Sequence, residues 1–573
     1  MTKQTFKSGT VSDLYLKLLA DRGIDYLIAN AGTDFASIIE SFAKAEAEGT
    51  KVPTPIIATH ENIAVSMAHG FYLATGKPQA VMVHVNVGTA NALCGLLNAA
   101  KDNVPIIFTA GRTPYTETGM TGSRAGSIHW AQEMFDQAGM VREAVKWDYE
   151  LKNGEQVEAV IDRAIEIAMA EPRGPVYITL PREVLATEIS NISYESPARR
   201  APVTKAYPDE SALEQTAELL ANSDRPLILT RTVGRDKEAS AALADFCEKH
   251  AIPVAEFRPV YSAMPSQHPM NLGYDVPANL EVADVVLALD AVAPWLPRWH
   301  GNPPEDSKVI HIGPDPLFPT YPIRGFPRDL AIESDLTAAI QGLDQILSNG
   351  MANDAKVAAR RERIGELQAK RQARISKMRE EHKNSSPIHP AWASYCLTEA
   401  LDDDALIFND YPLLLPHMNL KNPCNYFGSP EAGGLGWGTG AAIGAKLGAP
   451  DRTVVCAMGD GSYVFGNPMA AHQVVASNGL PMLFCIFNNS TWFAVRRATL
   501  DVYPEGYASK SNRMPLTMLE PSPHFEKIMD LFGGYGEKVE RAEDLPGAFE
   551  RALNAIHNEK RQALLNIIVS AAW

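Results

Sequence analysis

The chain has 573 residues, which is too long for a single hydrophobic core and indicates roughly three or four domains. Hydrophobic residues make up 46% and charged residues 21% of the chain, a composition typical of globular proteins rather than disordered or fibrous ones. The net charge is −16 and no basic cluster stands out, which argues against nucleic acid as a partner.

The amino-terminal segment and the cysteines predict a cytoplasmic protein. Residues 1–7 contain no apolar signal segment, and no run approaches the roughly 18 apolar residues of a membrane span. Neither export nor a membrane partner is therefore expected. The six cysteines, at positions 94, 247, 396, 424, 456 and 485, form no Cys-x-x-Cys pair. Several lie in apolar segments, as reduced thiols in a protein core do.

The first block, residues 1–190, alternates short apolar segments with amphipathic ones. Such alternation of strands and helices predicts a doubly wound parallel sheet. The expected strands are residues 26–29, 55–58, 80–83, 105–109 and 175–179.

A second α/β block extends over residues 200–345, after a polar stretch. Its pattern again predicts a parallel sheet with helices on both faces. The expected strands include residues 226–229, 285–289 and 308–312.

Residues 346–387 separate the second block from the third. Within them, Lys356–Lys383 mixes charges of both signs at helical spacing, which predicts a solvated linker helix. Residues 388–573 then repeat the α/β pattern. The sequence therefore predicts an α/β protein of three doubly wound parallel-sheet domains, with a helical linker before the last.

The third block carries the most informative motif. An apolar strand at residues 453–458 leads into Gly459-Asp460-Gly461-Ser462, about one helix follows, and a second apolar strand ends in Asn488-Asn489. Adjacent parallel strands would bring a carboxylate and an amide together as hard oxygen ligands for Mg²⁺. The glycines leave backbone N–H groups free to face a diphosphate.

In this order the motif resembles that of the thiamine-diphosphate (ThDP) enzymes, in which Gly-Asp-Gly is followed by Asn-Asn. The resemblance implies ThDP and Mg²⁺ as cofactors, with the metal held by Asp460, Asn489 and the backbone carbonyl of Thr491. Residues 459–462 would bind the diphosphate. The three blocks correspond in order to the pyrimidine-binding, middle and diphosphate-binding domains of that family, so the resemblance covers essentially the whole chain.

Three more cofactor contacts follow from the resemblance. Glu61 follows an apolar strand and opens a helix rich in small residues, as the family's activating carboxylate does; it would bind the aminopyrimidine and manage its proton. A glutamate in a first helical turn can also serve only to complement the helix dipole. Gly433 would present its carbonyl to the pyrimidine amino group, and Leu435 would support the bent cofactor.

A finer resemblance, to benzoylformate decarboxylase, points to proton-transfer residues. His84 and His300 correspond to its two active-site histidines, and Thr33 stands where a serine meets the substrate carboxylate. Gln132 instead lies in a segment similar to one in acetolactate synthase and pyruvate oxidase, where the glutamine faces the reacting centre. Both histidines also fit structural roles, His84 at a strand end and His300 beside tryptophans.

Two segments depart from the relatives. Residues 409–416 carry mainly apolar side chains where the decarboxylase has a hydroxyl-rich loop, which predicts a more apolar pocket wall. Residues 230–235 lack the glycine cluster and the arginine-rich strand end with which relatives bind FAD, so FAD is not expected. Further apolar wall residues would be Trp295, Trp299, Leu413, Leu414, Trp492 and Phe493.

The resemblance predicts a non-oxidative 2-oxo acid decarboxylase that acts through an enamine intermediate. Protonation would release an aldehyde, and capture by a second carbonyl compound, such as an aldehyde, would give a 2-hydroxy ketone. An acetolactate synthase-like carboligase or a 2-hydroxy ketone lyase shares these steps and remains an alternative.

The alternative from another class is a non-catalytic regulatory protein of the same fold, which the presence of Glu61 and Asp460 disfavours. The resemblance also implies a homodimer or homotetramer. Each active site would lie between two subunits, with Glu61 of one chain and Asp460 of the other serving the same cofactor.

Overall fold

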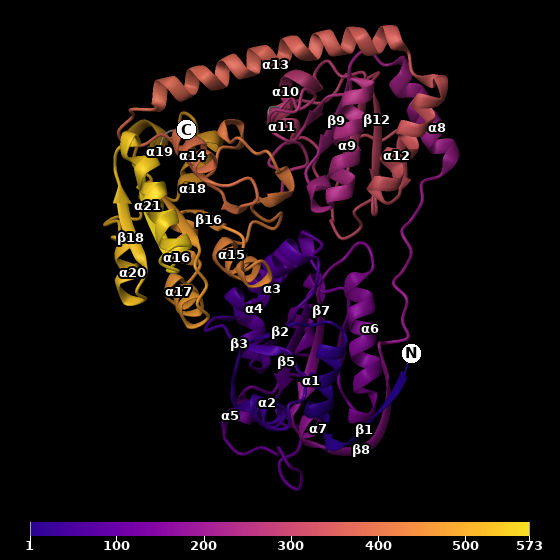
Figure 1. The fold of residues 1–573 in the computed structure, drawn as a ribbon, viewed down its shortest axis with the longest axis vertical. Helices are drawn as coiled ribbons and strands as arrows, with labels where there is room; N and C mark the ends of the chain where they lie inside the picture. The colour runs from indigo at the N-terminus through magenta and orange to yellow at the C-terminus, as the bar shows by residue number, and fades with distance from the viewer. Residues whose placement is uncertain (1, 275, 572–573) are drawn as a thin grey trace.

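The computed structural model describes residues 2–274 and 276–571 and contains three α/β units (Figure 1). The amino-terminal unit lies at the bottom of the view, the middle unit at upper right and the carboxy-terminal unit at upper left. Every apolar segment predicted to be a strand forms one, and the prediction of three doubly wound parallel sheets is confirmed. Within the described ranges, no helix has both the length and the apolar character that crossing a bilayer requires.

The amino-terminal unit contains a six-stranded parallel sheet in the order β3-β2-β4-β5-β7-β6. Because β2 lies between β3 and β4, the carboxyl ends of these three strands meet at one edge of the sheet. The strands are β2 (Tyr26–Asn30), β3 (Thr54–Ile57), β4 (Ala80–Val83), β5 (Ile107–Arg112), β6 (Asp148–Glu150) and β7 (Val176–Pro181). The main helices are α1 (Val11–Asp21), α2 (Ala36–Glu48), α3 (Glu61–Thr75), α4 (Val85–Lys101) and α6 (Val157–Met169).

An antiparallel ribbon accompanies this unit and was not predicted. β1 (Thr2–Thr10) pairs with β8 (Glu188–Ser196), placing Phe6 opposite Ile192. Both side chains pack against the core of the amino-terminal unit. Ile189 and Tyr194 of β8 also join this core, but polar residues separate these apolar positions, so neither strand shows the continuous apolar run that identifies a buried strand in a sequence.

The middle unit contains a five-stranded parallel sheet in the order β10-β9-β11-β12-β13. Its strands are β9 (Pro226–Thr230), β10 (Val254–Ala255), β11 (Val285–Leu289), β12 (Lys308–Gly313) and β13 (Leu330–Glu333), and its main helices are α8 (Glu210–Asn222), α9 (Lys237–His250) and α12 (Leu336–Ile346). Helix α13 (Asp354–His382) then crosses the top of the molecule to the carboxy-terminal unit (Figure 1).

The carboxy-terminal unit contains a six-stranded parallel sheet in the order β15-β14-β16-β17-β19-β18. Strands β14, β16 and β17 are neighbours, so their carboxyl ends also share one edge. The strands are β14 (Leu406–Asp410), β15 (Tyr426–Phe427), β16 (Val454–Gly459), β17 (Leu483–Asn488), β18 (Tyr535–Val539) and β19 (Ala563–Ile568). The main helices are α14 (Pro390–Ala400), α15 (Trp437–Gly448), α16 (Asp460–Phe465), α17 (Pro468–Ser477), α18 (Phe493–Val502) and α21 (Leu545–His557).

Between β16 and β17 the sequence predicts about one helix, and the structure contains two. Helix α16 ends at Phe465, Asn467 adopts a left-handed φ of 52°, and Pro468 begins α17. A left-handed residue followed by proline cannot continue an α-helix. The chain therefore turns here before it reaches the second strand of the motif.

Helices α3 and α15 join the two outer units through a close backbone contact. A Cβ atom on Gly70 would lie 1.8 Å from the carbonyl oxygen of Ala441, and one on Gly444 would lie 1.8 Å from that of Met67. Any larger residue at either position would force the helices apart. The small residues near Glu61 and Gly433 thus hold together the two helices that follow these candidate site residues.

Candidate active site

His84 is held by a buried carboxylate at the edge of the amino-terminal sheet. It caps the start of α4, and its Nδ1 lies 2.6 Å from Oδ1 of Asp34. The side chains are only 20% and 4% exposed. The hydrogen bond to Asp34 raises the pKa of His84 above its ordinary value, against the opposing effect of burial, and the charge of Glu61 adds to the increase. A protonated imidazole is therefore favoured at this position.

Asp34 was not among the predicted site residues, although the sequence places it next to Thr33. Its second oxygen accepts the N–H of Val85 at 3.2 Å, and Val85 adopts a φ of 33°, which a β-branched residue rarely does. Two glycines make room for the pair: a Cβ on Gly32 would lie 2.1 Å from Nδ1 of His84, and one on Gly111 would lie 1.8 Å from Oδ2 of Asp34. Only a residue with no side chain fits at either position.

Gln132 contacts the other ring nitrogen of the same imidazole. It follows α5 (Ile128–Ala131), and its amide nitrogen lies 3.3 Å from Nε2 of His84. Its buried Oε1 has no hydrogen-bond partner among the described residues. Asp34 keeps a proton on Nδ1 of His84, so Nε2 is the nitrogen whose protonation can change. When His84 is neutral, Nε2 accepts a hydrogen bond from the side-chain NH₂ group of Gln132. When His84 is charged, Nε2–H can donate to Oε1 of Gln132 once the amide group has rotated by half a turn. Gln132 can thus bind His84 in both protonation states.

Glu61 lies at the same sheet edge. It is the first residue of α3, only 7% of it is exposed, and one of its oxygens accepts from the side-chain amide of Asn91 at 3.2 Å. Thr33 is exposed in the short turn that also contains Asp34. Four of the five predicted catalytic residues, Thr33, Glu61, His84 and Gln132, therefore come from this one edge.

His300 lies elsewhere, in the middle unit. It ends the short helix α11 (Pro297–His300), its Nδ1 accepts the N–H of Leu296 at 3.0 Å, and its ring meets Phe257 edge-on at 4.4 Å. It also borders a cavity of about 250 Å³ between the middle unit, α13 and the carboxy-terminal unit. The chain thus places its two candidate histidines in different units.

Asp460 lies at the equivalent edge of the carboxy-terminal sheet, at the first position of α16. It is 3% exposed; Oδ1 accepts the N–H of Gly461 at 3.0 Å, and Oδ2 has no hydrogen-bond partner among the described residues. Burial raises the pKa of Asp460 to about 6, against the opposing effect of nearby backbone N–H groups. A buried carboxylate with an unused oxygen is suited to binding a divalent cation.

The paired asparagines have different environments. Asn488 is 2% exposed, and its amide nitrogen donates to Ser522 at 2.8 Å and to Asn566 at 3.1 Å. Asn489 is half-buried, and its Oδ1 accepts the N–H of Thr491 at 3.0 Å. Since an amide oxygen has two lone pairs, Asn489 retains one for another ligand. Asn488 supports the turn, whereas Asn489 is left with an oxygen that can bind another ligand.

The loop at residues 430–436 completes this edge. Gly433 adopts a φ of 68°, and Gly434 exchanges two hydrogen bonds with the side chain of Asn98 in α4, at 3.0 and 2.9 Å. Leu435 is half-buried. The loop that carries Gly433 and Leu435 is therefore fixed to the amino-terminal unit.

Asp410, at the end of β14, is a second buried carboxylate that the sequence analysis passed over. It accepts the N–H of Gly438 at 3.3 Å and the hydroxyl of Ser462 at 3.4 Å. Burial raises the pKa of Asp410 to about 6. It connects the start of α15, just after the loop at residues 430–436, to the Gly-Asp-Gly-Ser turn.

The expected apolar wall is partly wrong. Trp295 is fully buried inside the middle unit, where its Nε1 donates to Asn302 at 3.1 Å, and Leu413 belongs to the core of the carboxy-terminal unit. Trp492 does lie at the candidate site, since a Cβ on Gly461 would be 2.6 Å from its ring. The error arises because apolar residues next to motifs are also core residues, and sequence alone does not separate the two.

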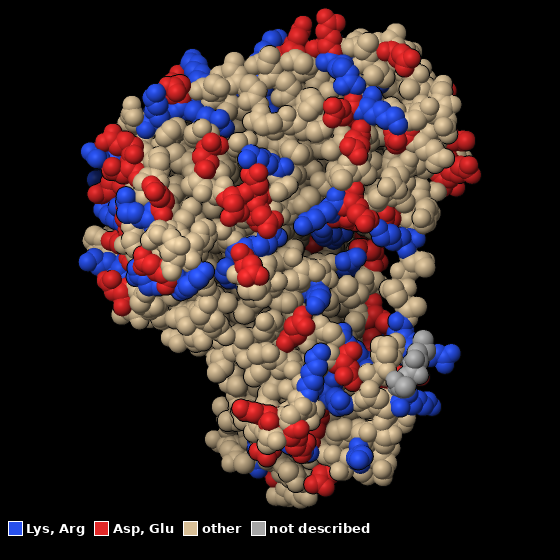
Figure 2. Space-filling model, viewed as in Figure 1, with Lys and Arg blue, Asp and Glu red and all other residues tan. Residues whose placement is uncertain are grey.

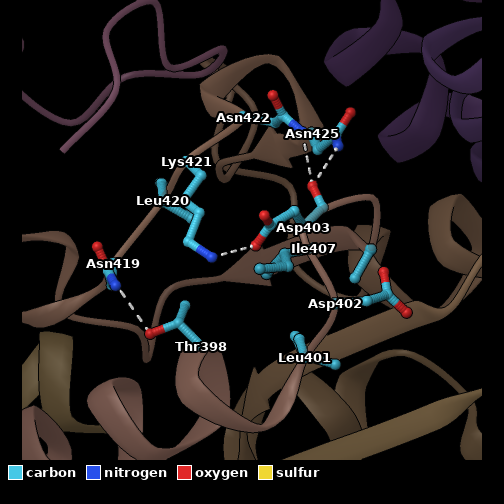
Figure 3. A pocket seen from close by; sticks show the side chains of 11 residues that line it. Thr398, Leu401, Asp402, Asp403, Ile407, Asn419, Leu420, Lys421, Asn422 and Asn425 are labelled. Carbon is cyan, nitrogen blue, oxygen red and sulfur yellow. Dashed lines mark hydrogen bonds and ion pairs between the residues drawn. The ribbon is translucent and has the colours of Figure 1, made fainter. Parts of the chain in front are cut away.

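A small pocket of about 30 Å³ lies at the opposite edge of the carboxy-terminal sheet (Figure 3). It is bordered by Asp402, Asp403 and Ala405, which precede β14, and its polar groups pair with one another: Lys421 lies 2.8 Å from Asp403. It is therefore remote from Asp410 and Asp460, which lie at the carboxyl ends of their strands.

Comparison with known proteins gives three family matches in chain order. Residues 9–140 match "Thiamine pyrophosphate enzyme, N-terminal TPP binding domain", residues 213–343 match the central domain of the same family, and residues 412–567 match its C-terminal TPP binding domain. The two predicted cofactor-binding regions thus fall within the two matches described as TPP binding.

Individual relatives are distant. A probable 2-ketoarginine decarboxylase of Pseudomonas aeruginosa is 26% identical, with 93% of each chain covered. The acetolactate synthase large subunit of Haemophilus influenzae is 25% identical, covering 95% of this chain and 92% of the relative. The structure of a 4-hydroxybenzoylformate decarboxylase from Rhodococcus jostii superposes with a TM-score of 0.77 at 22% identity, covering 98% of this chain and 99% of that one, and so shows a shared fold.

Proposed function

Because the chain belongs to the thiamine pyrophosphate enzyme family, we propose that it is a ThDP- and Mg²⁺-dependent, non-oxidative 2-oxo acid decarboxylase. When bound, ThDP supplies the nucleophilic carbon and the electron sink that loss of CO₂ requires. The protein must bind and orient the substrate, exclude water and transfer protons. The observation that carries the proposal is the ion pair of His84 with the buried Asp34, at the sheet edge that also carries Glu61.

The residues at the carboxy-terminal sheet edge fit a metal and a diphosphate. Asp460 offers a buried oxygen without a partner, Asn489 an amide oxygen with a free lone pair, and Thr491 a backbone carbonyl. Oxygen ligands of this kind suit Mg²⁺, which also binds phosphate oxygens. These three residues would hold the metal, and residues 459–462 would hold the diphosphate at the start of α16.

The amino-terminal sheet edge provides the proton-transfer groups. Glu61 is buried and would hold a proton against the aminopyrimidine, with its carboxylate oriented by Asn91. His84 would deliver a proton from Nε2, because Asp34 occupies Nδ1 and favours the charged imidazole. Gln132 would hold the ring in place before and after that transfer.

The nature of this proton donor favours decarboxylation over carboligation. Release of an aldehyde needs a proton at the carbon that lost CO₂, and a favourably charged histidine provides it. A carboligase needs that carbon to remain unprotonated until a second carbonyl compound arrives. An acetolactate synthase-like carboligase or a 2-hydroxy ketone lyase remains the alternative activity, since one relative bears the acetolactate synthase name.

The active enzyme is a homodimer or homotetramer in this proposal, with Glu61 of one chain and Asp460 of another at each site. Exposed apolar side chains support such an assembly; they include Ile57, Val464, Phe465 and Met469. In Figure 2 the narrow waist on the left of the visible face, below α17 and beside β3 in Figure 1, shows few charged side chains, whereas the flank above it is densely charged. Analytical ultracentrifugation would detect the oligomer, and a monomer that retains full activity would contradict this arrangement.

The function is tested by product analysis. The enzyme with ThDP and Mg²⁺ is given pyruvate, a branched-chain 2-oxo acid, 2-oxoglutarate or benzoylformate, with and without an added aldehyde. Free aldehyde and CO₂ support the decarboxylase, and His84→Ala should lower aldehyde release more than hydroxy ketone formation. Hydroxy ketone without free aldehyde identifies a carboligase, cleavage of 2-hydroxy ketones identifies a lyase, and absence of ThDP binding identifies a non-catalytic protein.

A further inference from the structure

Two side chains of α4 reach the loop that carries Gly433. Asn98 and Asp102 are four residues apart, so they lie on one face of α4, and Asp102 caps the end of the helix. Both are buried, with 0% and 4% of the residue exposed. Buried polar side chains need hydrogen-bond partners, and both of these find them in the backbone of residues 430–436.

The two side chains bind the loop on either side of Gly433. Oδ1 of Asp102 accepts the N–H of Glu431 at 2.9 Å. Oδ1 of Asn98 accepts the N–H of Gly434 at 3.0 Å, and the Asn98 amide nitrogen donates to the Gly434 carbonyl at 2.9 Å. The backbone is therefore held two residues before Gly433 and one residue after it.

The side chain of Glu431 anchors the loop from a second direction. It pairs with Arg231, which directly follows β9 of the middle unit, at 2.8 Å, and both side chains are 13% exposed. Arg231 is fixed in turn, because its Nε and Nη2 donate to the carbonyl oxygen of Arg258 at 3.2 and 3.0 Å. The loop is thus attached to the amino-terminal unit through its backbone and to the middle unit through a side chain.

Asp102 serves the loop as an uncharged hydrogen-bond acceptor. Its Oδ2 has no hydrogen-bond partner among the described residues and lies 3.7 Å from Nε2 of His69, which is also buried. Burial raises the pKa of Asp102 to about 8 and lowers the pKa of His69 to about 3, so near pH 7 both groups are mostly uncharged. An asparagine at position 102 would preserve the contact with Glu431, because an amide oxygen also accepts an N–H.

We propose that Asn98 and Asp102 are positioning residues that hold the backbone of Gly433 ready for the pyrimidine amino group of ThDP. This inference rests on the ThDP binding that the proposed function includes. A loop that is already ordered loses little conformational entropy when a ligand binds. Without the two anchors the binding conformation would be only partly populated in the free protein, and the apparent affinity for ThDP would fall in proportion.

The first experiment measures cofactor affinity without turnover. ThDP is titrated calorimetrically, with Mg²⁺ and no substrate, into the parent protein, Asn98→Ala, Asp102→Ala and Asp102→Asn. We expect each alanine variant to bind ThDP about 5- to 50-fold more weakly, the range for loss of one buried hydrogen bond. Asp102→Asn should stay within about twofold of the parent, because it keeps the acceptor.

Asp284→Ala is the matched control. Asp284 is half-buried, and its carboxylate also accepts backbone N–H groups, from Asp224 at 2.7 Å and from Arg225 at 3.1 Å. It directly precedes β11, at the opposite edge of the middle sheet from Arg231. The substitution should destabilise the protein in denaturant unfolding and leave the affinity for ThDP unchanged.

Hydrogen exchange provides a second measurement, which needs no substitution. In the parent, the N–H groups of Glu431 and Gly434 should be protected before ThDP is added and should gain little protection when it binds. In Asn98→Ala and Asp102→Ala, protection of residues 430–436 should appear only with ThDP. Fast exchange of these amides in the free parent, followed by protection in the complex, would overturn the inference.

Because neither measurement uses a substrate, the inference and the decarboxylase proposal can fail separately. An affinity for ThDP that is unchanged in both alanine variants, or that falls equally in Asp284→Ala or Asp102→Asn, overturns the inference and leaves the decarboxylase intact. If the expected affinities and exchange are found but no 2-oxo acid releases CO₂, the inference is supported and the decarboxylase proposal fails. A parent protein that does not bind ThDP overturns both.

Discussion

Nδ1 of His84 and Oδ1 of Asp34 lie 2.6 Å apart, although the residues are separated by 50 positions in the chain. This contact fixes a proton on Nδ1 and leaves Nε2 for exchange with a substrate. It also raises the pKa of His84. The pair therefore determines both which nitrogen acts and the pH range in which it can act.

Asp34→Asn should move the alkaline limb of the pH profile for aldehyde release to lower pH, by about 1 unit or more, because the carboxylate that favours charged His84 is gone. Aldehyde release measured from pH 5 to 9 checks this. Asp530→Asn, at an exposed position, is the control and should leave the limb in place. An unchanged limb in Asp34→Asn would show that His84 is not the proton donor.

The same contact makes a signed prediction about stability. A histidine whose pKa is raised by folding stabilises the native state fully below its unfolded value of about 6.5, and this contribution is lost as the pH rises through the folded pKa. The difference in unfolding free energy between the parent and Asp34→Asn should therefore be larger at pH 5.5 than at pH 9. Denaturant unfolding at the two pH values measures it, and a difference that grows with pH would contradict the ion pair.

Glu61→Gln should lower turnover by roughly 10²- to 10⁴-fold, the range for loss of a general acid or base, while thermal unfolding stays close to that of the parent. Steady-state rates and calorimetry provide the two readouts. Glu210→Gln is a matched control, because Glu210 also occupies the first position of a helix, α8, and is exposed. If both substitutions had the same small effect, Glu61 would only complement the dipole of α3.

The two asparagines of the motif should separate binding from stability. Asn489→Ala should weaken Mg²⁺ and ThDP binding with little effect on the unfolding of the free protein, because its Oδ1 has one local partner. Asn488→Ala should destabilise the fold by about 1–3 kcal/mol, since it leaves buried polar groups unpaired. Calorimetric titration and unfolding experiments, each with and without EDTA, distinguish the effects of the two substitutions. Equal loss of binding with no change in stability in both variants would contradict the assignment.

Gly70→Ala should destabilise the protein by about 1–3 kcal/mol or more, because a methyl group at that position overlaps the carbonyl of Ala441 across the α3–α15 contact. The control is Gly365→Ala on α13, where a Cβ meets open space. That substitution should stabilise the helix by about 0.5–1 kcal/mol. A lower unfolding temperature for Gly70→Ala and a higher one for Gly365→Ala would support the close helix contact. Stabilisation by both substitutions would rule it out.

The sequence alone was sufficient to identify the α/β fold and both sheet edges. Apolar strands such as 80–83 and 285–289 form where predicted, since a fully buried parallel strand needs a continuous apolar run. The Gly-Asp-Gly turn and Asn489 can also be recognised from the order of residues along the chain. Their placement at one sheet edge follows from the rule that neighbouring parallel strands end at the same edge.

The tertiary structure decided what local pattern does not encode. It joined Asp34 to His84 in a space that Gly32 and Gly111 leave open, and it placed Trp295 in the core of the middle unit. Each of these relationships depends on contacts between segments far apart in the chain, where the packing of the units determines which side chains meet.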